Sequence, residues 1–153
     1  MADETSSYWS FTQIPRPQDI QDWAHAEVLV ADSRLDQGGI RAAVDAVFEA
    51  NPALGAVFEP RCDRWMARPG GSWTWAVEPP GVAVAEVIAR QRASFDMRTG
   101  RLFAVSLLPG APERLVLTAS HLCVDGQSWQ TVVEDLITEY DEGALAPEAA
   151  YHA

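Results

Sequence analysis

Two segments of the chain carry its clearest hydrophobic patterns, and they follow each other closely. Residues 114–119, Arg-Leu-Val-Leu-Thr-Ala, are mostly apolar, which is typical of a central strand buried on both faces. Residues 127–140 place apolar side chains at offsets of 0, 3, 4, 7, 8 and 11 from Trp129, which predicts an amphipathic helix. The connecting residues 120–126, Ser-His-Leu-Cys-Val-Asp-Gly, are therefore expected at the edge of a core.

The rest of the chain alternates shorter strand and helix patterns. Strands are expected at 27–30, 54–59, 64–68, 73–78 and 102–108. One helix is expected to follow the candidate N-cap Asp36 and to end at Asn51-Pro52, and another covers 82–92. The pair Gly70-Gly71 suggests a hairpin between two of the strands. This order predicts an α/β (α+β) fold, a mixed sheet covered by helices on one face.

The same patterns divide the chain into three parts. Residues 1–23 lack a clear period, contain the proline-punctuated stretch 14–17, and are expected to form a leader segment. Residues 24–140 hold the strands and helices and form one domain, which suits a chain of 153 residues. Residues 141–153 are rich in Ala, Glu and Pro, which predicts a tail or linker.

Charge and cysteine content exclude several classes of partner. The chain has 22 acidic and 11 basic residues, a net charge of −11, so nucleic acid and anionic membrane surfaces are not expected partners. No apolar run approaches the roughly 18 to 20 residues of a membrane span. The acidic N-terminus does not resemble a secretory signal, and a cytoplasmic location is the expectation. Cys62 and Cys123 lie far apart, so neither a metal site nor a disulfide is expected.

His121 is the first candidate for chemistry. A neutral imidazole at the end of a buried strand can act as a base near neutral pH if its other nitrogen is hydrogen-bonded. Ser120 points to the opposite face of the strand by alternation. The residues alone favour a satisfied core histidine over a catalyst. His25 and His152 stand in no comparable context.

The start of the next helix adds to this candidate site. Gly126 permits a close approach of the backbone or a positive φ. The free N–H groups of the following helix could stabilise an oxyanion. Two roles are open for Asp125, which either caps the helix or pairs with an arginine that braces the turn. A structural role is favoured over direct proton transfer.

Residues 120–126 resemble the His-His-x-x-x-Asp-Gly signature of nonribosomal peptide synthetase condensation domains, which belong to a superfamily that includes chloramphenicol acetyltransferase. Residues 35–54 resemble the first core helix of that family and the turn after it. Residues 94–103 are similar to its Phe-Asp-Leu…Gly-Pro-Leu segment, and Asp125-Gly-Gln-Ser128-Trp continues the signature. The matches occur in the family's order across about residues 24–140.

The resemblance implies a single chloramphenicol-acetyltransferase-like lobe, half of a condensation domain. It implies that His121 is the catalytic or substrate-positioning residue, that Asp125 is the structural aspartate and that Gly126 opens the turn to substrate. Ser120 and Ser128 are possible supporting residues. The implied reaction is acyl transfer from a thioester to an amine or hydroxyl. The thioester is carried on carrier-protein phosphopantetheine or on coenzyme A, and no cofactor or metal is expected to be bound directly.

Three departures from the family pattern stand out. Ser120 replaces the leading histidine. Gly55 stands where the family usually places an arginine that braces the signature aspartate, and three other arginines could take its place: Arg61, Arg64 and Arg101. The chain also matches only the first of two lobes. It is then a piece of a larger synthetase, a subunit that self-associates or joins another polypeptide, or a half-domain used for docking.

Two functions compete at this point. The first is one lobe of an acyltransferase whose His121 acts as base or positioning residue once a second lobe or an oligomer completes the cleft. The second is a non-catalytic module that docks a carrier protein or a synthetase neighbour, for which arginines at 61, 64 and 68 could supply a local basic patch. An unrelated α/β domain with a chance histidine is the third, weaker interpretation.

Overall fold

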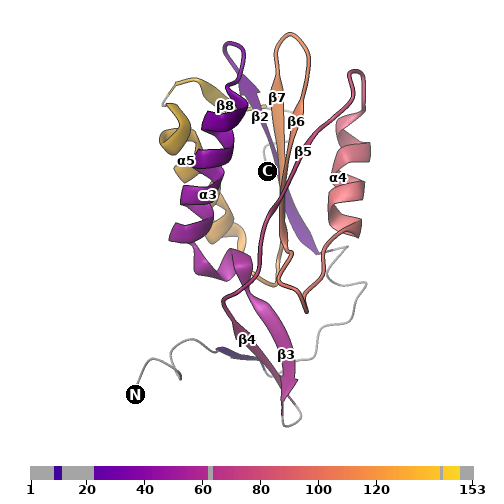
Figure 1. The fold of residues 1–153 in the computed structure, drawn as a ribbon, viewed down its shortest axis with the longest axis vertical. Helices are drawn as coiled ribbons and strands as arrows, with labels where there is room; N and C mark the ends of the chain where they lie inside the picture. Colours follow the sequence, from indigo (N-terminus) through magenta and orange to yellow (C-terminus); the bar gives the residue numbers. More distant parts are fainter. Residues whose placement is uncertain (1–8, 12–22, 62–63, 142, 149–153) are drawn as a thin grey trace.

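The main sheet has five strands in the order β5-β6-β7-β2-β8 (Figure 1). The computed structural model describes residues 9–11, 23–61, 64–141 and 143–148. The five strands are β5 (Thr74–Val77), β6 (Phe103–Leu108), β7 (Arg114–Ser120), β2 (Ala24–Ala31) and β8 (Leu145–Pro147). β5 runs parallel to β6 and the other neighbours are antiparallel. The mixed sheet is confirmed, with β7 at its centre.

Helices cover both faces of this sheet, so the expectation of one covered face is wrong. α3 (Gln37–Ala50) and α5 (Gly126–Asp141) pack together on one side, and α4 (Val84–Ala93) lies on the other (Figure 1). α4 connects the parallel strands β5 and β6, and such a crossover helix must lie over a face of the sheet. Every residue of β6 is buried, which requires cover on both sides.

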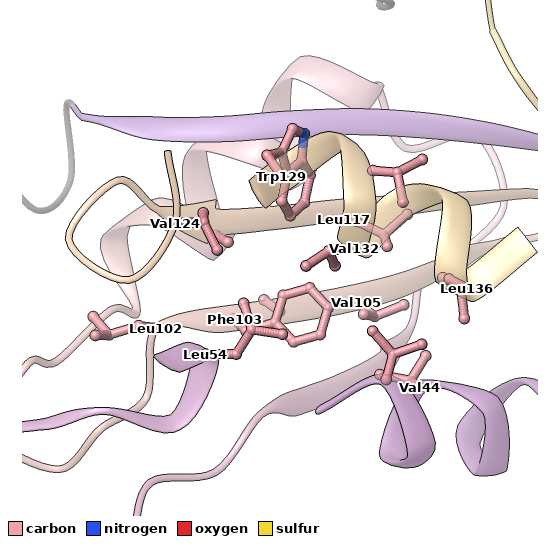
Figure 2. Packing of buried hydrophobic residues seen from close by; sticks show 14 of the residues in the cluster. Val44, Leu54, Leu102, Phe103, Val105, Leu117, Val124, Trp129, Val132 and Leu136 are labelled. Atoms are coloured by element: carbon pink, nitrogen blue, oxygen red, sulfur yellow. The ribbon is translucent and has the colours of Figure 1, made fainter. Parts of the chain in front are cut away.

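The larger hydrophobic core lies between the sheet and the pair α3 and α5 (Figure 2). Phe103 of β6 meets Trp129 of α5 edge to face, with ring centroids 6.4 Å apart and planes at 81°. Leu136 and Val44 bring the two helices onto the same core. A smaller core joins α4 to the opposite face and contains Val28, Val84, Val87, Leu108 and Val116.

A second sheet of three strands, in the order β1-β4-β3, stands beside the main one. It consists of β1 (Trp9–Phe11), β4 (Arg64–Arg68) and β3 (Val57–Arg61). The expected hairpin at Gly70-Gly71 is wrong, because β4 pairs with β3 and β1 while β5 joins the main sheet. A Cβ on Gly71 would lie 2.1 Å from the carbonyl oxygen of Gly100. The glycine therefore marks a close backbone approach where the chain passes between sheets.

Most predicted elements are present with shifted ends. α3 is confirmed in detail, since Asp36 Oδ2 accepts a hydrogen bond from the Gly39 N–H at 3.1 Å and Asn51 ends the helix. The strand expected at 54–59 starts later, because Pro52–Gly55 forms a 3₁₀ turn.

Strands also form in both segments expected outside the domain. Within 141–153, α5 ends at Asp141 and Leu145–Pro147 pairs with β2. Within 1–23, Trp9–Phe11 pairs with β4. The stretch 14–17, Cys62 and His152 lie outside the described residues.

Candidate functional site

His121 follows the last residue of the central strand and is held there by its backbone. Its N–H donates to the carbonyl of Trp23 at 2.8 Å, which extends the pairing of β7 with β2 beyond the partners Ser120 and Ala24. The side chain is half-buried. The strand end thus places an imidazole at the rim of the core rather than inside it.

The imidazole of His121 belongs to a row of stacked rings. The indole of Trp23 lies 3.9 Å away with an interplanar angle of 10°, and the imidazole of His25 lies 5.0 Å away at 28°. Trp23 and His25 are two residues apart along the chain, which puts them on one side and about 7 Å from each other. The ring of His121 fits between them. Trp129 of α5 continues the row, 6.0 Å from His25 at 16°.

His25 belongs to the site although nothing in the sequence pattern singled it out, so the expectation that it stands in no comparable context is wrong. The antiparallel register of β2 and β7 sets His25 opposite Ala119, on the strand face that His121 also uses. The available signal was a histidine near the start of an apolar strand. Without the register, that signal could not be connected to His121.

His25 is the more shielded of the two imidazoles at its Nε2 atom. This atom is buried and has no hydrogen-bond partner among the described residues. Burial lowers the pKa of His25 below its ordinary 6.5, and the nearby His121 lowers it further, whereas Asp125 opposes both effects. His25 is therefore neutral at physiological pH.

A cavity of about 310 Å³ lies beside this row of rings. It is lined by Ala24, His25, Ala26, Glu27, Gly126, Trp129 and Gln130. Glu27, which lies two residues from His25 along β2, is a buried carboxylate. Polar side chains of β2 and residues of the first turn of α5 thus line the same cavity.

Asp125 caps α5, which is the first of its two predicted roles. Its Oδ1 accepts the N–H of Ser128 at 2.7 Å, and its backbone carbonyl accepts the N–H of Trp129. The Ser128 N–H is the main cause that holds the pKa of Asp125 below its ordinary value, followed by the Ser128 side chain, the Gln127 N–H and the charge of His121. The carboxylate is exposed, so it is not the buried charge that would demand an arginine.

The three arginines considered as substitutes make other contacts. Arg61 pairs with Glu59, and Arg101 donates from Nε to the Ser94 carbonyl at 3.0 Å. The side chain of Arg64 lies outside the described residues. The helix cap, rather than an arginine, is thus the contact that the structure shows for Asp125.

Phe48 explains why position 55 has no side chain. A Cβ on Gly55 would lie 2.6 Å from Cζ of Phe48, so the ring of this α3 residue takes the space where a side chain would begin. Gly55 itself is buried. Gly55, which departs from the family pattern, therefore leaves room for the ring of Phe48 on α3.

Ser120 and Cys123 stabilise the turn between β7 and α5. Ser120 is fully buried, and its Oγ accepts the N–H of Leu122 at 3.1 Å. Cys123 is buried among apolar residues, and burial raises the pKa of its thiol to about 12. The thiol is therefore no nucleophile at neutral pH.

Gly126 is the first residue of α5 and borders the cavity. A Cβ added there would meet nothing within 4 Å. The backbone does not require a glycine at this position in this chain. What the glycine contributes is open space at the helix start.

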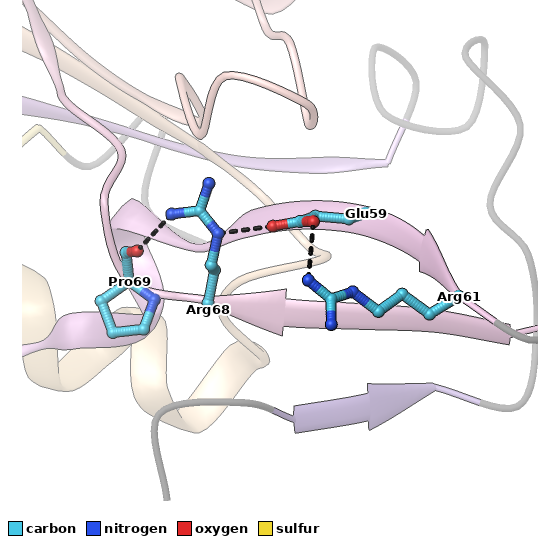
Figure 3. A network of polar contacts seen from close by, with 4 residues as sticks. All are labelled: Glu59, Arg61, Arg68 and Pro69. Atoms are coloured by element: carbon cyan, nitrogen blue, oxygen red, sulfur yellow. Dashed lines mark hydrogen bonds and ion pairs between the residues drawn. The ribbon is translucent and has the colours of Figure 1, made fainter. Parts of the chain in front are cut away.

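The expected basic patch is largely neutralised. Figure 3 shows that Glu59 is paired with both Arg61 and Arg68, and that Arg68 also donates to the Pro69 carbonyl at 3.2 Å. One carboxylate therefore offsets two of the three cations. This weakens the argument for a carrier-docking patch based on charge at this place.

Two classes of site find no support in the described residues. Histidine, cysteine, aspartate and glutamate side chains form no group of three or more that could hold a metal ion in that part of the chain. None of the helices described combines the length and the apolar character needed to cross a bilayer.

The fold and the site define a class. A mixed sheet with helices on both faces presents a histidine at the end of its central strand, directly before a capped helix. This is the arrangement that the sequence resemblance implies, one chloramphenicol-acetyltransferase-like lobe.

Comparison with known proteins agrees with this class. No family model matches the chain. One of the linear gramicidin synthase proteins of Brevibacillus parabrevis is 30% identical over an alignment of 155 positions, and the match covers 94% of this chain and 3% of the synthase. Tyrocidine synthase 1 of the same organism is 28% identical over an alignment of 138 positions, and the match covers 83% of this chain and 13% of that synthase.

Solved structures show the same fold. The epimerization domain from the third module of tyrocidine synthetase B superposes with a TM-score of 0.70 and 21% identity, over 88% of this chain and 34% of that domain's chain. A variant of the starter condensation domain of rhizomide synthetase RzmA, in complex with C8-CoA, superposes with a TM-score of 0.69 and 18% identity. The match covers 91% of this chain and 37% of that domain's chain. The chain belongs to the condensation and epimerization domain family of nonribosomal peptide synthetases, and it spans about a third of the solved domains.

Proposed function

We propose that this chain is one lobe of a condensation-type acyltransferase, in which His121 acts as base or positioning residue. The observation that carries the proposal is the row of stacked rings that fixes the imidazole of His121 beside the start of α5. An imidazole in one fixed orientation is what general base catalysis requires.

The proposed reaction is transfer of an acyl group from a thioester to an amine or hydroxyl. The nucleophile forms a bond to the thioester carbonyl carbon, the C–S bond breaks, and His121 passes the nucleophile's proton to the leaving thiolate. The partial positive charge at the start of α5 would help to stabilise the oxyanion. No cofactor is needed for this balance, since the thioester itself supplies the activated acyl group.

The substrate arm is proposed to be the phosphopantetheine of a carrier protein or the equivalent part of coenzyme A. The RzmA variant of the same fold binds C8-CoA, which supports this choice of arm. The partners are then a carrier protein or synthetase module. The other wall of the cleft comes from a second lobe or from self-association.

A non-catalytic docking module is the second candidate. It is favoured by the extent of the match, because the chain spans about a third of the solved domains. In this case His121 serves the fold alone.

One assay separates the two functions. Acyl transfer from a thioester to an amine is measured with the complementary lobe supplied, for the wild type and for His121→Ala. We expect His121→Ala to lower kcat roughly a hundredfold or more, the usual cost of losing a general base. Glu134→Ala, an exposed change on α5, is the matched control and keeps the wild-type rate. Equal rates for wild type and His121→Ala would contradict the catalytic role and favour docking.

A further inference from the structure

The second histidine of the ring row takes no chemical step in the function proposed above. His25 contacts His121 from β2, and its own far side faces Trp129 of α5. It also lines the cavity at the start of α5. A ring in this place restricts how His121 can turn about its side-chain bonds.

Trp23 cannot hold His121 alone. The indole covers one face of the imidazole, and 51% of its own surface is exposed. A ring held from one side can still tilt away toward the other. His25 closes that side from a regular strand, whose position is fixed by seven register partners along β7.

That the second ring is an imidazole also bears on which histidine takes up the transferred proton. A positive charge on His121, whose ring lies 5.0 Å from that of His25, disfavours a second positive charge on His25. The charged or titratable groups around His25 are His121 after β7, Asp125 at the start of α5 and Glu27 on β2 itself. His25 Nε2 is buried and has no hydrogen-bond partner among the described residues, so an added proton there would be poorly solvated.

We propose that His25 is a positioning residue, which clamps the imidazole of His121 against Trp23 and leaves the transferred proton on His121. This rests on the proposed acyl-transfer function for its kinetic consequence, but the clamp itself is a property of the folded chain. His25 touches neither the nucleophile nor the thioester. It acts through the orientation of His121.

Two variants of His25 test the clamp. His25→Ala removes the ring and frees His121, and His25→Phe replaces the ring by another flat one that needs no hydrogen-bond partner. With the second lobe supplied, we expect His25→Ala to lower kcat between roughly tenfold and a hundredfold with KM little changed, as for a misplaced catalytic group. His25→Phe restores most of kcat. A kcat that is unchanged in His25→Ala, or equally low in both variants, would overturn the clamp.

Nuclear magnetic resonance of ring-labelled histidine tests the clamp without any activity. In the wild type we expect the rings on both sides to shift the ring protons of His121 upfield and to restrict the motion of its ring. We expect His25→Ala to move these signals downfield and to increase ring mobility, while His25→Phe keeps both near the wild type. Signals of His121 that are the same in all three proteins would overturn the proposal.

The two readouts distinguish failure of the clamp from failure of the proposed function. If His121→Ala leaves the transfer rate unchanged while the His121 signals respond to His25→Ala, the acyl-transfer role is wrong and the clamp stands. If His121→Ala abolishes transfer and His25→Ala changes neither kcat nor the His121 signals, the acyl-transfer role stands and the clamp is wrong. Far-ultraviolet circular dichroism confirms that each variant is folded.

Discussion

At the scale of single residues, individual hydrogen bonds between neighbouring residues keep the turn before α5 in shape. The Ser128 N–H holds the carboxylate of Asp125 at the helix start, and this bond is the main reason for the lowered pKa of Asp125. Ser120 Oγ accepts the Leu122 N–H, and so holds the turn that His121 begins. The residues of the signature thus hold the turn in shape, and His121 is the one whose ring is presented at the rim.

Removal of the cap gives a pH-dependent loss of stability. We expect Asp125→Ala to lower the urea midpoint at pH 7, because α5 loses the acceptor for an N–H of its first turn. The folded pKa of Asp125 is lowered, so the charged carboxylate stabilises the fold above its ordinary pKa of 3.8. This contribution is lost as the pH falls through the lowered folded value. The difference between wild type and variant therefore shrinks in acid.

Asp125→Asn is the matched control for the cap. Asparagine keeps an oxygen acceptor and caps helices nearly as well as aspartate, so its urea midpoint at pH 7 should lie near the wild type. A difference between wild type and Asp125→Ala that stays constant from pH 7 to pH 2 would show that the carboxylate charge adds nothing to the cap.

At the scale of elements, a parallel crossover and a close approach between two backbone segments set the positions of the strands and helices. β5, α4 and β6 form a parallel crossover, which puts α4 on the face opposite α3 and α5 (Figure 1). The chain reaches β5 from the smaller sheet at Gly71, where backbone lies against backbone. The Gly71 N–H also donates to the Gly55 carbonyl at 2.8 Å, which ties the crossing to the turn after α3.

Two glycine substitutions should have opposite effects on stability. Gly71→Ala puts a Cβ 2.1 Å from the Gly100 carbonyl oxygen, and neither backbone can move without disturbing the junction. We expect a loss of roughly 2 kcal/mol or more in the free energy of unfolding, as for other strained sites. Gly38→Ala is the control in the first turn of α3, where nothing lies within 4 Å. It should stabilise the protein by roughly 0.5 to 1 kcal/mol, since alanine favours helices.

Urea denaturation followed by circular dichroism measures both glycine variants. Equal stability of Gly71→Ala and the wild type would mean that the close approach at Gly100 is easily relaxed. The two sheets would then be joined less tightly than the contact implies.

At the scale of the whole molecule, the ring row lies at a surface that the lobe does not cover. Trp23 is 51% exposed although it contacts the candidate base. An exposed indole of this size beside a site is typical of a surface that meets another protein. The chain also spans about a third of the solved domains of its family.

Activity should therefore depend on a second lobe. We expect the monomeric chain to transfer acyl groups weakly or not at all, because one wall of a cleft does not exclude water or orient two substrates. Adding the complementary lobe of a related condensation domain should raise the rate at least roughly tenfold. Size exclusion with light scattering shows whether the chain is monomeric, self-associated or in complex. Full activity of a monomer would contradict this dependence.

The sequence alone determined the elements whose signals are local. The apolar run at residues 114–119, the helical period from Trp129 and the cap at Asp36 all reappear, as β7, α5 and α3. These features depend on residues within a few positions of each other, so a linear pattern contains them. The signature resemblance likewise placed His121 at the junction of strand and helix.

Only the tertiary structure decided which distant residues meet. The register of β2 on β7 brings His25 to His121, and a shift of one residue would turn His25 to the opposite face. Whether Gly70-Gly71 formed a hairpin or a crossing depended on Gly100, about thirty residues away. Such contacts are set by the packing of whole strands and helices, which hydrophobic periodicity along the chain does not record. His121 can thus be recognised from neighbouring residues in the sequence, whereas the rings that hold it in place are brought to it by the fold.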